Sequence, residues 1–203
     1  FFIDMAMGIL TVLFNRQIMQ YLGSDALAIY GHIINVSTFV QCCAYSVGQA
    51  SQPIISTNFG AGKEARIRET LRYALWTVVF FGVFWTAPSV ACPNLCIRIF
   101  MSPTETILAM APSIIRAYAI SFLLLPFNIF SAYYFQAILQ PKAAFIVSVA
   151  RGLVISGALI LMLPLLAGAD SLWFAMPITE LVTAVYAAAC ISRYTARLDA
   201  KAA

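Results

Sequence analysis

The stretch GQASQPIISTNFGAGKEARIRE, residues 48–69, ends a long apolar run with two glutamines, a proline, a Gly-Ala-Gly turn and three basic side chains. The chain around it has 203 residues, of which 62% are hydrophobic and only 10% are charged. Soluble domains have roughly a quarter of their residues charged. The solvent of this chain is therefore lipid, and we interpret the stretch as the end of one membrane span and the turn into the next.

Six segments are apolar over the roughly 20 residues that a helix needs to cross a bilayer core. They are too long and too uniformly apolar for barrel strands. The sequence thus predicts an all-α integral membrane protein, one domain over residues 1–203. The chain begins inside an apolar run without a signal peptide, so we expect it to be the C-terminal part of a longer protein. The predicted spans are 1–21, 26–58, 65–91, 112–139, 143–166 and 172–194.

Short polar segments separate these spans. Gly60 and Gly62 are expected to supply left-handed positions that end the second span. Residues 102–105, Ser-Pro-Thr-Glu, read as a capping box with Ser102 as the cap. We expect it to open a short helix at the outer surface before residue 112.

Basic residues predict the orientation, because cytoplasmic loops are enriched in Lys and Arg. Nine fall on one side of the membrane and three on the other, which places the C-terminus in the cytoplasm, with a bacterial inner membrane as the expected location. Lys63, Arg66 and Arg68 would anchor the opening stretch there. The nine are Lys63, Arg66, Arg68, Arg72, Lys142, Arg151, Arg193, Arg197 and Lys201, and the three are Arg16, Arg98 and Arg116.

Large polar side chains recur on one face of the second span. Gln41, Tyr45, Gln49 and Gln52 are spaced by four, four and three residues, and Pro53 follows them. Polar groups inside a membrane usually face a bundle interior or a cavity. We expect this stripe to line a cavity beside a proline-loosened helix; packing between neighbouring helices is the alternative.

Two other spans show the same pattern. The fourth has Ser121, Asn128 and Gln136 on one face, interrupted by Pro126. On the first, the residues on one face are Asp4, Gly8, Thr11 and Asn15. Broken helices with convergent polar stripes are typical of secondary transporters.

Two carboxylates are embedded in the spans. Glu180 lies roughly 12 Å from the outer boundary by helical rise, where it would bind an ion, titrate or hold a neighbouring helix. Asp4 lies near the cytoplasmic edge, as an ion-binding group or a hydrated interfacial acid.

Other functions find little support in the residue pattern. His32 is the one histidine, so no metal site is expected, and a structural role is favoured for it. Gly62-Lys63 lacks the rest of a phosphate loop. Basic residues are too scattered for a nucleic-acid surface, and no cluster of reactive groups indicates an enzyme.

Residues 30–73, YGHIINVSTFVQCCAYSVGQASQPIISTNFGAGKEARIRETLRY, resemble the C-terminal half of the multidrug and toxic compound extrusion (MATE) family. The shared features are a polar Gly-x-x-x-x-Pro helix end, an Asn-x-Gly-Ala-Gly stretch and a basic turn. Residues 117–145 look like the family's tenth helix and the turn into its eleventh, and the likeness covers essentially the whole chain.

The resemblance implies the second six-helix lobe of a twelve-helix, pseudo-two-fold antiporter, whose N-terminal lobe would be the missing partner. Such transporters export amphipathic or cationic small molecules by rocking, driven by Na⁺ or H⁺, without another cofactor. Asn128 stands where some members have an aspartate, so we expect the main coupling acid to lie in the other lobe. A lipid-linked oligosaccharide flippase of the same superfamily and a non-transporting structural subunit are the alternatives.

Overall fold

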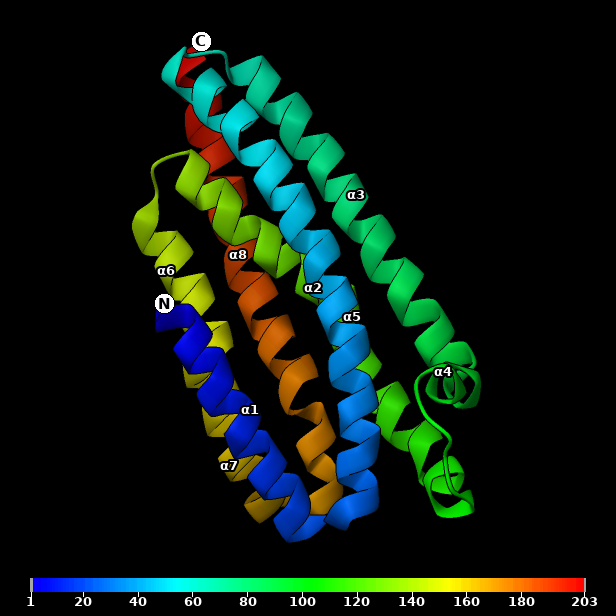
Figure 1. Cartoon of the computed structure of the whole chain (residues 1–203). Coiled ribbons are helices and arrows are strands. Elements are labelled where there is room, and N and C mark those ends of the chain that lie inside the picture. The colour runs from blue at the N-terminus through cyan, green and yellow to red at the C-terminus, as the bar shows by residue number, and fades with distance from the viewer. Residues whose placement is uncertain (1, 203) are drawn as a thin grey trace.

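Helices form all the regular structure in the computed structural model, which describes the backbone of residues 2–202 and the side chains of residues 8–196. The long helices run side by side as one bundle (Figure 1). The elements are α1 (Phe2–Tyr21), α2 (Gly23–Gly60), α3 (Glu64–Ala91), α4 (Pro93–Phe100), α5 (Glu105–Ala137), α6 (Pro141–Val149), the π-helical segment η1 (Ala150–Val154), α7 (Ile155–Ala167), the 3₁₀ segment η2 (Ala169–Phe174) and α8 (Ala175–Ala202).

Five helical segments in the described part of the chain are long and apolar enough to cross a membrane, in agreement with the second to sixth predicted spans. They are Gly23–Gly60, Glu64–Ala91, Glu105–Ala137, Pro141–Ala167 and Ala169–Ala196. The first predicted span forms α1, whose first side chains lie outside the described residues.

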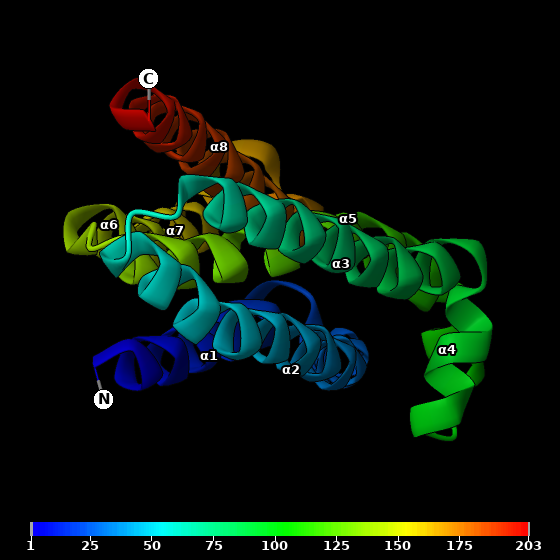
Figure 2. The same cartoon turned by 90° about the horizontal axis from the view of Figure 1, so that it is seen from above.

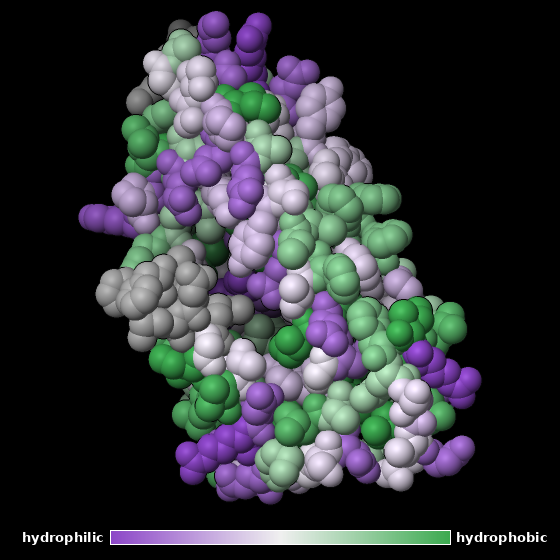
Figure 3. Space-filling view, in the orientation of Figure 1, coloured by the Kyte–Doolittle hydropathy of each residue, from purple (hydrophilic) through white to green (hydrophobic). Residues whose placement is uncertain are grey.

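The outside of the bundle is apolar where a soluble protein would be polar. On α3, Trp76, Phe80 and Phe84 follow one another at intervals of four residues and are all more than half exposed. Figure 3 shows hydrophobic side chains over much of the middle and lower part of one face, with hydrophilic ones gathered at the upper end and others at the lower left and right. A helix that is apolar toward both the core and the exterior needs an apolar environment on its outside, which a lipid bilayer provides.

The centre of the bundle is α5, which packs against α2, α3, α6 and α8. Seen from above, α1 and α2 lie on one side of it and α8 lies on the other (Figure 2). One part of the core is an aromatic cluster in which Phe14 stacks on Tyr30 with ring centroids 4.6 Å apart, and Tyr118 and Trp173 surround that pair. These contacts join α1, α2, α5 and η2.

The start of α5 differs from its prediction. Thr104, not Ser102, is the cap: its side chain accepts a hydrogen bond from the Ile107 amide at 3.3 Å. The helix then continues through Pro112 instead of stopping before it. Proline is tolerated inside membrane helices because neighbouring groups re-satisfy the backbone. The separate short helix is α4, which precedes the cap.

The glycine turn after α2 also differs in detail. Gly62 has a positive φ of 65°, as predicted, but Gly60 is the last residue of the helix and is not left-handed. The amide of Ala61 closes the helix by donating to the carbonyl oxygen of Thr57 at 3.1 Å. Neither Pro53 nor Pro126 ends its helix; the loosening expected at Pro53 stays a prediction.

Candidate functional site

Glu180 is a fully buried acid on α8, with no exposed surface. Its neighbours on the same helix do not neutralise it. Thr179 and Thr183 are buried too, but each hydroxyl donates to a carbonyl oxygen one turn back in α8, at 2.8 Å. The partners of the carboxylate therefore come from other elements.

Asn128 on α5 is the first of these partners. Its Nδ2 donates to Glu180 Oε2 at 2.6 Å and to the Glu180 backbone oxygen at 2.9 Å. A carboxylate only accepts hydrogen bonds, so the amide nitrogen is the atom that must face it. The opposite atom, Asn128 Oδ1, is buried without a hydrogen-bond partner among the described residues. A buried acceptor of this kind is costly unless water or a ligand satisfies it.

Arg151 is the second partner. Its Nη1 lies 3.2 Å from Glu180 Oε1, and its side chain is only 11% exposed. The residue lies in η1, where the fifth span leaves α-helical geometry for one π-helical turn. π-Helical turns are rare and occur frequently at functional sites. Here the turn contains the one residue of this span that carries a charge between Ala143 and Ala167.

Together the three side chains form a network, which we call the Asn128–Arg151–Glu180 network. It joins α5, η1 and α8 inside the bundle. The charges of Arg151 and Glu180 cancel, which makes it possible to bury both side chains. Neither charge would be stable in this position without the other. Removing one partner of a buried ion pair leaves an uncompensated charge in a low-dielectric interior.

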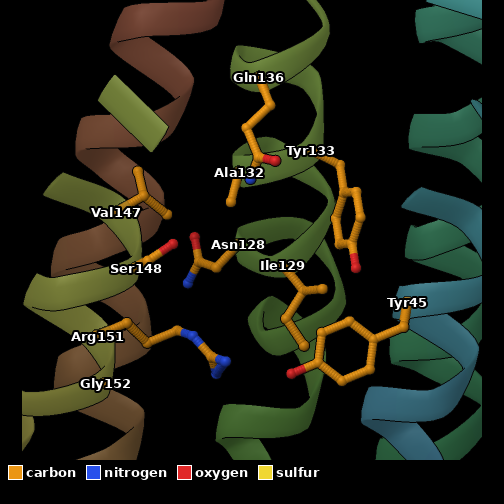
Figure 4. A pocket seen from close by; sticks show the side chains of 10 residues that line it. All are labelled: Tyr45, Asn128, Ile129, Ala132, Tyr133, Gln136, Val147, Ser148, Arg151 and Gly152. Atoms are coloured by element: carbon orange, nitrogen blue, oxygen red, sulfur yellow. The ribbon is translucent and has the colours of Figure 1, made fainter. Parts of the chain in front are cut away.

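A cavity of about 160 Å³ lies against one side of this network. Figure 4 shows the guanidinium of Arg151, the amides of Asn128 and Gln136 and the phenol rings of Tyr45 and Tyr133 around it. We call it the tyrosine cavity. Its other lining residues are Ile129, Ala132, Val147, Ser148 and Gly152.

The position of the Tyr133 ring depends on a glycine of α2. A Cβ atom added at Gly48 would lie 2.5 Å from Tyr133 Cδ2, so only glycine allows the ring to rest against that helix. Tyr45 meets the same ring edge to face, with centroids 6.4 Å apart. The two phenols are thus held by contacts between α2 and α5.

A second, smaller cavity of about 50 Å³ lies on the other side of the network. Both Arg151 and Glu180 line it, with Gln41, Ser37, Tyr30 and Ser121. The Gln41 amide nitrogen donates to Ser37 Oγ at 3.2 Å. Its other lining residues include the apolar side chains Leu10, Phe14, Ile34, Leu125 and Met176, so the space is polar only around the ion pair and its hydroxyl and amide neighbours. Arg151 lines both cavities and so separates them.

The structure brings together five of the residues that the sequence predicted for a substrate or ion pathway: Gln41, Tyr45, Asn128, Gln136 and Glu180. Gln49, Gln52 and Asn15 line neither cavity; Gln49 is exposed, and the other two are half-buried. The side chain of Asp4 lies outside the described residues.

His32 is buried in the N-terminal third of α2 and packs edge to face on Phe100 at 5.1 Å. No three His, Cys, Asp or Glu side chains gather into a metal site within the described residues. Lys63, Arg66 and Arg68 are exposed around the turn between α2 and α3.

Arg151 is the site residue that sequence reasoning missed. In the sequence it stands close to the turn at Lys142, and so it is one of the nine basic residues from which the orientation is predicted. A signal was present, because an arginine nine residues past that lysine, inside a run that is otherwise apolar, needs a buried acid as a partner. Glu180 in the next span was the available acid.

Comparison with known proteins agrees with this architecture. The MatE family model matches residues 2–162. No curated protein matches the chain significantly. Among solved structures, the outward-facing form of a multidrug resistance MATE family transporter aligns with a TM-score of 0.84 at 15% identity, over 98% of this chain and 45% of that one.

Two further solved structures are equally similar. The inward-facing form of a multidrug resistance MATE family transporter gives a TM-score of 0.84 at 15% identity, over 99% of this chain and 47% of that one. A MOP superfamily transporter from Pyrococcus furiosus gives 0.84 at 14%, over 98% and 45%. The chain thus spans less than half the length of these transporters. At such low identity, their TM-scores show a shared fold and nothing more. The family model covers residues 2–162, which is most of the sequence, so the chain belongs to the MATE family.

Proposed function

We propose that this chain is one lobe of a secondary transporter that exports amphipathic or cationic small molecules in exchange for Na⁺ or H⁺. In this proposal the second lobe faces the tyrosine cavity, and the two lobes rock around the substrate. The observation that carries the proposal is the Asn128–Arg151–Glu180 network, a buried ion pair between two cavities.

The network supports coupling because its net charge depends on whether a cation is bound to the Glu180 carboxylate. A proton or a sodium ion at the carboxylate removes the partner of Arg151. Removing one partner of a buried ion pair destabilises a protein by about 3–5 kcal/mol. A shift of this size is close to the roughly 5.5 kcal/mol that moves a two-state equilibrium from one side to the other. We therefore assign Glu180 a coupling role alongside the acid that the sequence led us to expect in the other lobe.

Rigid-body rocking has separate support. The chain is as similar to an outward-facing MATE transporter as to an inward-facing one, with a TM-score of 0.84 in each case. A lobe that moves as a unit would give such equal similarity, because its internal fold would not change between the two states. The change of access then comes from its position relative to the other lobe.

The tyrosine cavity suits ligands that are partly apolar and carry hydrogen-bond donors. Tyr45 and Tyr133 offer ring faces, which attract cations, and Asn128 Oδ1 offers a buried acceptor without a partner in the described residues. An oligosaccharide flippase would instead need arginines available for sugar phosphates. Arg151 lines the cavity, but Glu180 neutralises it, so the antiport proposal is preferred.

The test is efflux by the intact two-lobe protein in proteoliposomes under an imposed Na⁺ or H⁺ gradient. Glu180→Gln keeps the size of the side chain and removes its charge. We expect gradient-driven efflux to fall at least tenfold while equilibrium binding of an uncharged fluorescent substrate changes much less, because Glu180 itself does not line the tyrosine cavity.

Glu105→Gln is the matched control, since Glu105 is an exposed acid in the first turn of α5, away from both cavities. It should leave efflux unchanged. Full gradient coupling in a folded Glu180→Gln protein would remove Glu180 from the mechanism. Loss of substrate binding with coupling retained would assign it to the substrate site instead.

A further inference from the structure

A groove lies between α3 and α8, on the outside of the bundle, and takes no part in the network or its cavities. Its volume is about 520 Å³. Leu71, Leu75, Trp76 and Val79 form its α3 wall, Thr195 contributes from α8, and Arg68 and Arg72 lie at one end. We call it the α3–α8 groove. The view from above places α8 on the opposite side of the bundle from α1 and α2 (Figure 2), so the groove does not face the tyrosine cavity.

The walls of the groove are suited to an acyl chain. The residues that α3 contributes recur every three or four positions, so they follow one face of the helix. Leu71 is buried at the base, whereas Trp76 is 70% exposed and forms a raised edge. Apart from its two arginines and Thr195, every lining residue is apolar.

The length of the groove matches one leaflet of a bilayer. Arg68 and Val79 are eleven residues apart, which corresponds to roughly 16 Å along a helix. Half of the roughly 30 Å hydrocarbon core is about the same length. A chain lying along the groove would therefore run from the headgroup level to near the midplane of the bilayer.

The charged end supplies the selectivity. Arg68 and Arg72 are one turn apart, and the guanidinium of Arg72 lies over the Tyr73 ring, 5.3 Å from its centroid. Basic pockets between membrane helices on the cytoplasmic side bind anionic headgroups. Our topology puts this end of α3 at the cytoplasmic surface, where anionic lipids are enriched.

We propose that the α3–α8 groove is a binding site for an anionic glycerophospholipid, with the phosphate headgroup on Arg68 and Arg72 and one acyl chain along Leu71, Leu75 and Val79. This site is independent of the transport proposal. A lipid held here would brace α8, the helix that carries Glu180, against α3.

Trp76 makes the site measurable. The intact protein is placed in nanodiscs of dioleoylphosphatidylcholine that contain a small fraction of brominated phosphatidylglycerol or brominated phosphatidylcholine, whose bromine atoms quench tryptophan. Subtracting the quenching seen in a Trp76→Phe protein isolates the groove signal. We expect half-maximal quenching of Trp76 at an about tenfold lower fraction of the anionic lipid than of the zwitterionic one.

The double variant Arg68→Gln with Arg72→Gln should abolish this preference. Lys63→Gln with Arg66→Gln is the matched control, because it removes the same charge from the same surface but neither residue lines the groove. The control should keep most of the preference. Arg68→Lys with Arg72→Lys, which retains the charge, should keep part of it.

Three results would overturn the proposal. Equal quenching by the two lipids in the unmodified protein would show ordinary annular lipid only, and this comparison needs no variant to fold. Equal losses in both glutamine pairs would show a general surface potential. Absence of quenching by either lipid, together with a doubled particle mass in nanodiscs, would show that a second copy covers the groove.

Discussion

Arg151 changes the interpretation of the sequence more than any other residue. As a basic residue near a turn, it counted toward the cytoplasmic side; as a buried partner of Glu180, it carries no information about orientation. The corrected count is eight basic residues against three, so the predicted orientation is unchanged. The corrected role is larger, because an intramembrane arginine that lines two cavities lies between them and separates them.

The interdependence of Arg151 and Glu180 predicts a characteristic stability pattern. Arg151→Met leaves the carboxylate buried without its cation, and we expect a loss of about 3–5 kcal/mol in the free energy of unfolding. Adding Glu180→Gln removes the orphaned charge and should recover most of this loss, because replacing both partners of a buried pair is often neutral. Thermal unfolding of the purified protein in detergent measures both changes.

Arg116→Met is the control for losing an arginine from this bundle. Arg116 is exposed and its Nε donates to the carbonyl oxygen of Val90 at 3.0 Å, and no acid pairs with it within the described residues. It should cost about 1 kcal/mol or less. If the double variant is less stable than Arg151→Met alone, the ion pair is not what burial of Glu180 depends on.

Gly48 predicts a separate effect on the tyrosine cavity. In Gly48→Ala, the new Cβ would overlap the Tyr133 ring, a side chain that can rotate away into the cavity. We expect the affinity for a cationic substrate to fall several-fold with little change in melting temperature. Gly31→Ala, where a Cβ meets nothing within 4 Å, is the control and should bind normally. Equal affinity in both variants would show that Tyr133 does not shape the binding site.

At the scale of elements, hydrophobic length predicts most of the fold and polar spacing predicts part of the site. The spans follow from length because every backbone group in lipid must be bonded within its own helix. The predicted cap at Ser102 was wrong, because Thr104 caps α5. The predicted boundary at Pro112 was also wrong, since a proline that would end a soluble helix is tolerated in a membrane one. The residue spacing does not indicate the π-helical turn that contains Arg151, because the apolar run continues through it without a break signal.

Only part of the polar stripe on α2 reaches the two cavities. Gln41 and Tyr45 line cavities, whereas Gln49 and Gln52, on the same face, line neither of them. Helical periodicity assigns a face, but how far along that face a cavity extends depends on how α5 and η1 approach α2. That approach is a property of tertiary packing, which the sequence of one helix does not contain.

Close packing of α3 on α5 gives an element-scale prediction. A Cβ added at Gly82 would lie 2.7 Å from the backbone oxygen of Leu123, which cannot rotate away. Gly82→Ala should therefore push α3 from α5 and lower stability by about 1–3 kcal/mol, the usual cost of overpacking. Gly31→Ala is again the control, and it should be neutral or slightly stabilising in a helix. A melting temperature unchanged in Gly82→Ala would mean that the two helices separate easily.

At the scale of the whole molecule, the chain corresponds to less than half of the transporters that share its fold. The tyrosine cavity is lined from α2, α5, α6 and η1, and in the proposed transporter it faces the other lobe. The α3–α8 groove, the proposed lipid site, is lined by residues of those two helices. One lobe would thus have a polar face for substrate and a separate apolar face for lipid, which is what a lobe that rocks as a unit in a membrane needs.

Orientation in the membrane is the prediction on which the lipid site depends. With Arg151 set aside, eight basic residues against three still place the turn between α2 and α3 and the C-terminus in the cytoplasm. A fluorescent protein fused after Ala203 should fluoresce in cells, and alkaline phosphatase fused there should be inactive. The same reporters inserted at Ser102, on the opposite side, should give the reverse result. Phosphatase activity at the C-terminus would invert the bundle, move Arg68 and Arg72 away from the anionic leaflet and remove the basis for the lipid site, while leaving the buried network as it is.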